Sequence, residues 1–201
     1  VLLNLALITC KNATMKLNIL FLLSACIISS FSCRKDRIPI LTLPEATQTG
    51  QNTLGFLLGS NVWANYGRRC TTLGGCKDHK VTASLYKQNN GDFFFEVNAG
   101  FTADTIDQLF SFAATNITNT GTFALDSNLN HTVTFYANRD AGTFQIYRNR
   151  LPGKCSVTFT KFDTVTKIVS GVFHATLYNT FLLSDSIKIE SGRFDAQLSY
   201  R

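Results

Sequence analysis

From residue 53 onward, the chain consists of short segments in which apolar and polar positions alternate. Cys155, Val157 and Phe159 share one face of such a segment, and polar residues occupy the positions between them. Clusters of turn residues separate the segments, as at Asn90 and Gly91. Alternation with a period of two, interrupted by turn residues, is typical of half-buried β-strands.

This pattern predicts an all-β domain. The expected strands are 54–58, 62–66, 80–87, 93–99, 122–125, 132–137, 143–147, 154–162, 167–178, 186–190 and 193–200. We expect an antiparallel β-sandwich or a flattened β-barrel of about ten strands, with at most one short helix. Ser191 and Gly192 interrupt the last segment and predict a bulge or kink.

Residues 104–117 fit two interpretations. Asp104 could cap a helix with an apolar stripe that includes Ile106 and Phe110. Alternation through Phe110 and Phe112 fits a strand equally well. We expect a strand, because the neighbouring segments are strands.

The N-terminal part of the chain has the order of an export signal. In MKLNILFLLSACIISSFSCRKD, which starts at Met15, one lysine is followed by an apolar run, small residues, a cysteine and a group of charges. The run is shorter than the roughly 20 apolar residues that a spanning helix needs. We expect lipid attachment at Cys33, since cleavage there removes the whole run and leaves a polar start. Cys26, after Leu23-Ser24-Ala25, is the alternative, and a signal without lipid or an N-terminal anchor is a further one.

These features divide the chain into four parts. Residues 1–14 are expected to lie upstream of the true start at Met15, 15–32 to be a lipoprotein signal peptide, 33–52 a flexible tether, and 53–201 a single β domain. The expected location is outside the cytoplasm, anchored to the outer membrane on its periplasmic or cell-surface side. The membrane is then a partner through the N-terminal lipid.

Composition and cysteine content refine this picture. Hydrophobic residues make up 45% of the chain and charged residues 16%, which favours a packed domain over disorder. An exported protein forms disulfides. We expect a Cys70–Cys76 disulfide around a glycine-containing loop and Cys155 as a small buried residue. Pairing of Cys155 with Cys70 or with Cys76 is the alternative.

The formal net charge is +6, and the basic residues are scattered. No basic run interleaves with aromatic residues, so we expect no nucleic-acid partner. Weak attraction to an anionic glycan or lipid is compatible with the charge.

Two glycine-aromatic motifs, Ser170-Gly171-Val172-Phe173 and Gly192-Arg193-Phe194-Asp195, stand near the C-terminus, after a strand that ends in Asp163. In these motifs the chain resembles a family of small exported lipoproteins of Bacteroidota, catalogued as a domain of unknown function. The resemblance implies an exported β domain and assigns no functional residue. From the residues themselves we expect the glycines to allow close strand packing. Arg193 and Asp195 share one face, and we expect them to form a structural ion pair with neighbouring strands.

Candidate chemistry is sparse. Cys70, Cys76 and His79 could supply three zinc ligands, but the spacing is not that of a standard finger, and a disulfide beside a surface histidine is the simpler interpretation. Glu96 and Glu190 could form a carboxylate pair for glycoside hydrolysis, although outward positions on strands explain both.

The remaining histidines, His131 and His174, fall in separate strands, where polar-face positions are expected. No nucleophile-elbow, HExxH, phosphate-loop or EF-hand motif occurs, so we predict no catalytic residue, metal or cofactor.

We therefore expect a non-catalytic binding or structural module at the cell envelope, with a glycan or a protein as its ligand. A lipocalin-like barrel around a small apolar or glycan ligand is the first alternative. A hydrolase whose site assembles only in three dimensions is the second. A large internal cavity would favour the barrel, and convergent carboxylates or histidines in a cleft would favour the enzyme.

Overall fold

The computed structural model describes residues 40–71, 75–103, 106–127, 130–137 and 144–200. Within these residues there are thirteen strands and no helix. The strands are β1 (Thr53–Leu58), β2 (Asn61–Ala64), β3 (Arg68–Thr71), β4 (Gly75–Asp78), β5 (Thr82–Lys87), β6 (Phe93–Ala103), β7 (Ile106–Thr115), β8 (Gly121–Ala124), β9 (Thr132–Ala137), β10 (Gln145–Arg148), β11 (Cys155–Asp163), β12 (Ile168–Asn179) and β13 (Ser186–Tyr200). No helix in this part of the chain is long and apolar enough to cross a bilayer.

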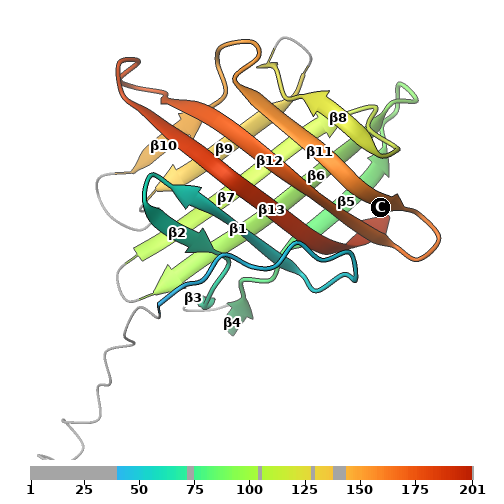
Figure 1. Ribbon diagram of the computed structural model, residues 1–201, viewed down its shortest axis with the longest axis horizontal. Coiled ribbons are helices and arrows are strands. Elements are labelled where there is room, and N and C mark those ends of the chain that lie inside the picture. Colours follow the sequence, from blue (N-terminus) through green and yellow to red (C-terminus); the bar gives the residue numbers. More distant parts are fainter. Residues whose placement is uncertain (1–39, 72–74, 104–105, 128–129, 138–143, 201) are drawn as a thin grey trace, which may run out of the picture. The chain divides into compact units, whose positions relative to one another are not determined.

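The domain has two layers that cross steeply (Figure 1). One layer has the order β2-β1-β13-β12-β11-β8, and the other has the order β5-β6-β7-β9-β10. They join where the end of β13 runs parallel to β5 and where β10 pairs with the end of β12, so that seven strands close a ring. The other ladders between named strands are antiparallel. The predicted all-β fold, a sandwich or flattened barrel, is confirmed.

Phenylalanine fills the space between the layers. The buried rings are those of Phe56, Phe95, Phe101, Phe110, Phe112, Phe135, Phe159, Phe173 and Phe194. Rings from opposite layers touch: Phe110 of β7 stacks on Phe173 of β12 with centroids 5.1 Å apart. Phe95 of β6 meets Phe159 of β11 edge to face at 5.2 Å. Such contacts add to the stabilisation from apolar burial itself.

The ambiguous segment is a strand. β7 pairs with β6 along its whole length and with β9 on its other side. Phe110, Phe112 and Ala114 are fully buried, as alternation predicts. A strand here buries these residues against the opposite layer, and a helix would break both ladders.

The predicted bulge lies in β13. Between Phe173 and Ala175, β12 has one residue where β13 has two, Glu190 and Ser191. Ser191 has a φ of 51°, in the left-handed region typical of a bulge. Gly192 follows directly opposite Phe173. A Cβ on Gly192 would lie 2.6 Å from the Phe173 ring, so this glycine allows the close packing expected from sequence.

The end of the predicted tether belongs to the folded domain. Asp195 of β13 is 1% exposed, and its carboxylate accepts hydrogen bonds from the Thr47 hydroxyl (2.6 Å) and from the backbone N–H of Gly50 (2.9 Å) and Gln51 (3.1 Å). The Ser170 hydroxyl donates a further bond at 2.7 Å. Burial of the carboxylate raises its pKa, but these hydrogen bonds together outweigh burial and lower the pKa to about 2.

This arrangement corrects the expected ion pairing of Arg193 and Asp195 with neighbouring strands, because the hydrogen-bond partners of both are neutral groups. Asp195 is held by neutral donors from residues 47–51 and from β12, because its side chain faces the segment that crosses β13. Arg193 instead donates to the carbonyl of Pro44 at 3.2 Å. Both residues therefore fasten the N-terminal segment to the same strand.

Candidate functional site

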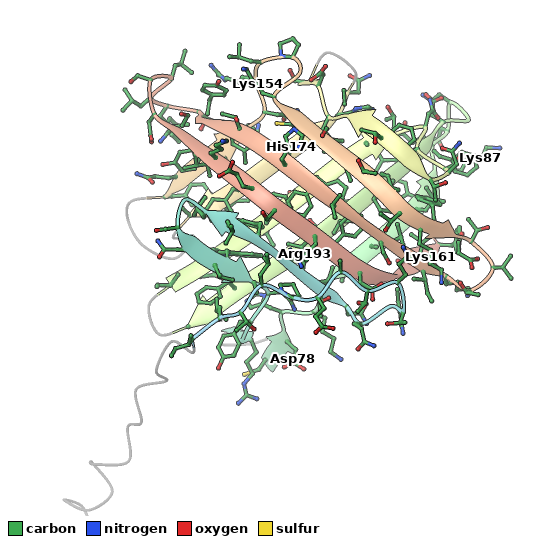
Figure 2. All side chains as sticks on the ribbon, viewed as in Figure 1. Asp78, Lys87, Lys154, Lys161, His174 and Arg193 are labelled. Atoms are coloured by element: carbon green, nitrogen blue, oxygen red, sulfur yellow. The ribbon has the colours of Figure 1, made fainter. Side chains whose placement is uncertain are left out.

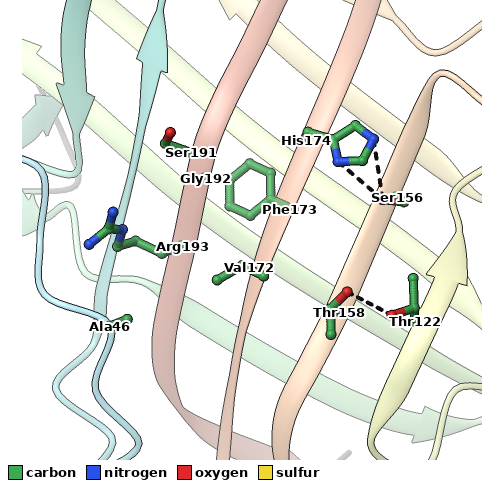
Figure 3. Close-up of a pocket in the computed structure, with 10 residues that line it drawn as sticks. All are labelled: Ala46, Thr122, Ser156, Thr158, Val172, Phe173, His174, Ser191, Gly192 and Arg193. Atoms are coloured by element: carbon green, nitrogen blue, oxygen red, sulfur yellow. Dashed lines mark hydrogen bonds between the residues drawn. The ribbon is translucent and has the colours of Figure 1, made fainter.

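A groove of about 540 Å³ with polar and apolar lining lies on the outer face of the layer that contains β13, β12 and β11 (Figure 3). We call it the outer groove. Its lining residues are Ala46, Thr122, Ser156, Thr158, Val172, Phe173, His174, Ser191, Gly192 and Arg193. Figure 2 shows His174 and Arg193 on the near face of this layer.

Strand alternation explains why these side chains converge. In β11, Val157 points into the core, so Ser156 and Thr158 point outward. In β12, the outward positions are Val172 and His174, on either side of buried Phe173. The register brings β12 beside both β11 and β13. Polar residues from neighbouring strands are thereby collected on one surface.

The bulge in β13 shapes the floor of the outer groove. Gly192 has no side chain, and the Phe173 ring covers it. Phe173 is only 5% exposed, so little of its ring reaches the groove surface. Val172 is 42% exposed beside it. Figure 3 shows Val172 between Arg193 on one side and Thr158 on the other. The groove thus combines a small apolar floor with polar walls.

The hydroxyl groups of the wall are partly bonded to each other. Thr122 Oγ1 and Thr158 Oγ1 are 2.8 Å apart on the neighbouring strands β8 and β11. A hydroxyl both donates and accepts, so each of these groups keeps bonding capacity for a ligand. Arg193 supplies a guanidinium group that donates a hydrogen bond to the Pro44 carbonyl. No carboxylate is among the groove-lining residues that the structure describes.

Ser156 and His174 lie side by side, but their geometry is not that of an activated nucleophile. Ser156 Oγ is 3.3 Å from Nδ1 and 3.4 Å from Nε2 of His174. The two distances are nearly the same, so neither ring nitrogen is singled out as the partner of the hydroxyl. Both values exceed the reach expected of a nucleophile and its base. Their proximity follows from direct cross-strand pairing.

The zinc interpretation receives no support among the described residues, where no three histidine, cysteine or acidic side chains cluster. The sequence had suggested that His79 is a surface histidine, but its side chain is only 11% exposed. Its Nε2 lies 2.5 Å from Thr102 Oγ1, and its ring packs against Gly100. Thr102 in turn donates to Asp107 at 3.0 Å. This buried polar chain gives His79 a structural role.

The described cysteines separate into a cross-strand pair and a buried thiol. Cys70 of β3 and Cys76 of β4 are directly opposite in an antiparallel register. Opposite residues in such a pair are about 4.5–5.5 Å apart at Cα, within the span of a disulfide. Cys155 is buried and free, which confirms its expected place and contradicts its pairing with the other two. Desolvation raises the pKa of the Cys155 thiol to about 11.

Other candidate residues are not brought together. Glu96 points outward from β6 in one layer, and Glu190 points outward from β13 in the other and pairs with Lys188 at 2.6 Å. They cannot act on one glycosidic bond. His131 is buried rather than on a polar face. A hydrogen bond from its Nδ1 to the Ala124 carbonyl at 2.8 Å compensates for the burial of the ring. The lipid-attachment candidates Cys33 and Cys26 lie outside the described residues.

Sequence reasoning missed the outer groove. The sequence shows that Ser156 and Thr158 alternate with apolar residues and therefore point outward. It does not show that Thr122 and Arg193, from other strands, lie beside them in one groove. A comparison with known protein families, curated proteins and solved structures gave no match.

Proposed function

We propose that the protein is an exported, lipid-anchored, non-catalytic binding module whose outer groove binds an anionic glycan. The observation that supports this proposal most directly is the chemistry of the side chains that line the groove. Hydroxyl groups from Thr122, Ser156 and Thr158 and an imidazole lie on one side, and a guanidinium group lies on the other, without a lining carboxylate among the described residues (Figure 3). Hydroxyl groups match sugar hydroxyls as both donors and acceptors. The guanidinium of Arg193 matches a sulfate or carboxylate by paired hydrogen bonds.

The location belongs to the same proposal. The signal segment that begins at Met15 and ends in Cys33 favours export and lipid attachment. Residues 47–51 donate hydrogen bonds to Asp195, so the folded domain begins only a short stretch of sequence after the proposed lipid site at Cys33. The groove would then be presented at the envelope on a short connection.

The filled interior supports this proposal over a lipocalin-like carrier. Such a carrier needs an internal cavity, of roughly 300 Å³ or more, for a small ligand. Here the rings of Phe110, Phe112 and Phe173 touch across the space between the layers. Opening a cavity would require removal of several of these contacts. A site on the outer face requires none.

A hydrolase is the weaker alternative for a geometric reason. Ser156 and His174 are the only hydroxyl and imidazole that meet in the described groove, and the oxygen is 3.3 and 3.4 Å from the two ring nitrogens without a short bond to either. Among the described lining residues there is also no carboxylate to orient the imidazole.

Isothermal titration calorimetry tests the proposal. We expect a chondroitin sulfate hexasaccharide to bind and maltohexaose, a neutral sugar of the same length, to bind more weakly. Arg193→Gln should weaken binding of the sulfated sugar about tenfold or more, the effect of losing a bond to a charged group. Thr158→Val should weaken binding of both sugars.

Matched controls come from the same strands outside the groove. Lys188→Gln removes an exposed cation from β13, and Thr176→Val removes a hydroxyl from β12. Both should leave affinity unchanged. Absence of heat with either sugar, or equal losses in groove and control variants, would contradict the proposal.

A further inference from the structure

A second surface lies at the end of the domain where β10 leads to β11 and β12 leads to β13 (Figure 1). Phe181 is 78% exposed, Leu182 59%, Leu183 57% and Leu151 49%. We call these four residues the apolar tip. Three of them are consecutive, so a single turn presents them together. Monomeric soluble domains rarely leave such a group uncovered without a contact that uses it.

Hydrogen bonds fix the turn that carries the tip. Asn179 Oδ1 accepts from the N–H groups of Phe181 and Leu182, at 2.9 and 3.3 Å. Asn179 Nδ2 donates to Asp185 at 3.0 Å, and the Tyr147 hydroxyl donates to the same oxygen at 2.8 Å. The side chains are therefore held outward by an ordered turn. An ordered turn loses little conformational entropy when it binds.

The charges beside the tip are positive. Arg148, Arg150 and Lys154 are exposed at the end of β10 and in the loop that follows. Arg150 and Leu151 line a small recess of about 190 Å³ together with Tyr178 and Leu183, so a cation lies directly against the tip.

The two carboxylates beside these loops, Asp185 and Asp126, both accept hydrogen bonds from the domain. Asp185 is half-buried and bonded as described above. Asp126 is half-buried and accepts from the Gly153 N–H at 2.7 Å. Both keep their negative charge, but they are half-buried and held against the domain by these hydrogen bonds, whereas the three cations are exposed.

We propose that the apolar tip inserts into the interfacial region of an anionic lipid bilayer, with Arg148, Arg150 and Lys154 at the headgroups. A protruding turn with exposed Phe and Leu side chains and flanking cations has the chemistry of an interfacial membrane contact. A protein partner would need a matching apolar recess. On a second copy, the 190 Å³ recess is already bordered by Leu183 of the tip, and the outer groove has hydroxyl groups along its wall. This contact is independent of the glycan proposal and of lipid attachment, because it uses residues at another part of the domain.

Tryptophan fluorescence in the full chain tests the insertion. Trp63 is the only native tryptophan and is buried, so it provides a constant background. Leu182→Trp places a second indole at the tip. With vesicles of phosphatidylcholine and phosphatidylglycerol whose acyl chains are brominated near the headgroups, we expect the added emission to fall by about half or more, since interfacial residues lie within ~5–10 Å of that depth.

Val165→Trp is the matched control. Val165 is 88% exposed in the β11–β12 turn, at the opposite end of the same layer. Both variants carry the same N-terminal segment, so any attachment through it is common to them. The control emission should be unquenched. Vesicles of phosphatidylcholine alone should quench Leu182→Trp less, and Arg150→Gln with Lys154→Gln should weaken vesicle affinity about fivefold per cation.

Three results would overturn the proposal. An unquenched Leu182→Trp would show that the tip does not enter the bilayer. Equal quenching at positions 182 and 165 would show unspecific adsorption. A Leu182→Trp emission that shifts with protein concentration, and not with lipid, would assign the tip to contact between copies of the chain.

Discussion

Replacement of Asp195 by Asn should detach the N-terminal segment from β13. The carboxylate of Asp195 gathers donors from Thr47, Gly50, Gln51 and Ser170. An Asn side chain has the same shape but one oxygen only, and its NH₂ group must face donors that it cannot satisfy. The variant therefore tests whether the negative charge, rather than the size of the side chain, holds this segment.

The magnitude follows from the pKa. Hydrogen bonding lowers the pKa of Asp195 from its ordinary 3.8 to about 2. Each unit corresponds to ~1.4 kcal/mol, so ionised Asp195 contributes about 2 kcal/mol to the free energy of unfolding. The unsatisfied donors in Asp195→Asn add a cost of ~1 kcal/mol or more. We expect a total loss of about 3 kcal/mol at neutral pH.

Urea denaturation at several pH values measures this loss. Because the folded-state pKa lies below the unfolded-state value, the contribution of Asp195 is complete above about pH 4 and disappears as the pH falls through about 2. The difference in unfolding free energy between the native chain and Asp195→Asn should therefore shrink to about 1 kcal/mol near pH 2. Amide hydrogen exchange at Gly50 and Gln51 should be faster in the variant.

Glu190→Gln is the control, since Glu190 lies on the same strand in an exposed pair with Lys188. Its effect should stay below about 1 kcal/mol. The claim that ionised Asp195 holds the N-terminal segment would be refuted by either of two results. Asp195→Asn could lose no more unfolding free energy than this control, or its loss could be the same at pH 2 and pH 7.

Further predictions concern the packing and the cysteines. Gly192→Ala should lower the free energy of unfolding by about 2 kcal/mol in urea denaturation, because its Cβ would lie 2.6 Å from the Phe173 ring; unchanged stability would contradict this packing. Cys155 should resist iodoacetamide at about pH 8 until the protein unfolds, as followed by mass spectrometry, because its thiol is buried and has a pKa of about 11. Reduction of the protein should raise its intact mass by two hydrogens through the Cys70–Cys76 disulfide, and alkylation of both cysteines without reduction would refute that bond.

Local patterns in the sequence predicted the parts of the fold that depend on neighbouring residues. Alternation of Cys155, Val157 and Phe159 located β11 and its buried face, and Ser191-Gly192 located the bulge. These features follow from the two-residue period of a strand and from the conformational preferences of turn residues. They require no knowledge of which strands are neighbours.

Features that join distant parts of the chain were not predictable in this way. The parallel pairing of β13 with β5 closes the ring between residues more than a hundred positions apart. Asp195 accepts a hydrogen bond from Gly50, which is 145 positions away, and no residue near Asp195 in the sequence predicts that partner. The outer groove likewise needs Thr122, Thr158 and Arg193 from three strands. Periodicity places each side chain on a face, but the spatial order of strands decides which faces meet.

The central claim is that the outer groove is the ligand site, and an NMR titration tests it most directly. Chondroitin sulfate hexasaccharide would be added to the ¹⁵N-labelled protein while backbone amide shifts are followed. The account predicts that shift changes cluster at Thr158, His174 and Arg193, and that Arg193→Gln needs about tenfold more ligand to show them. Absence of shift changes, or a cluster at the apolar tip instead of the groove, would contradict it.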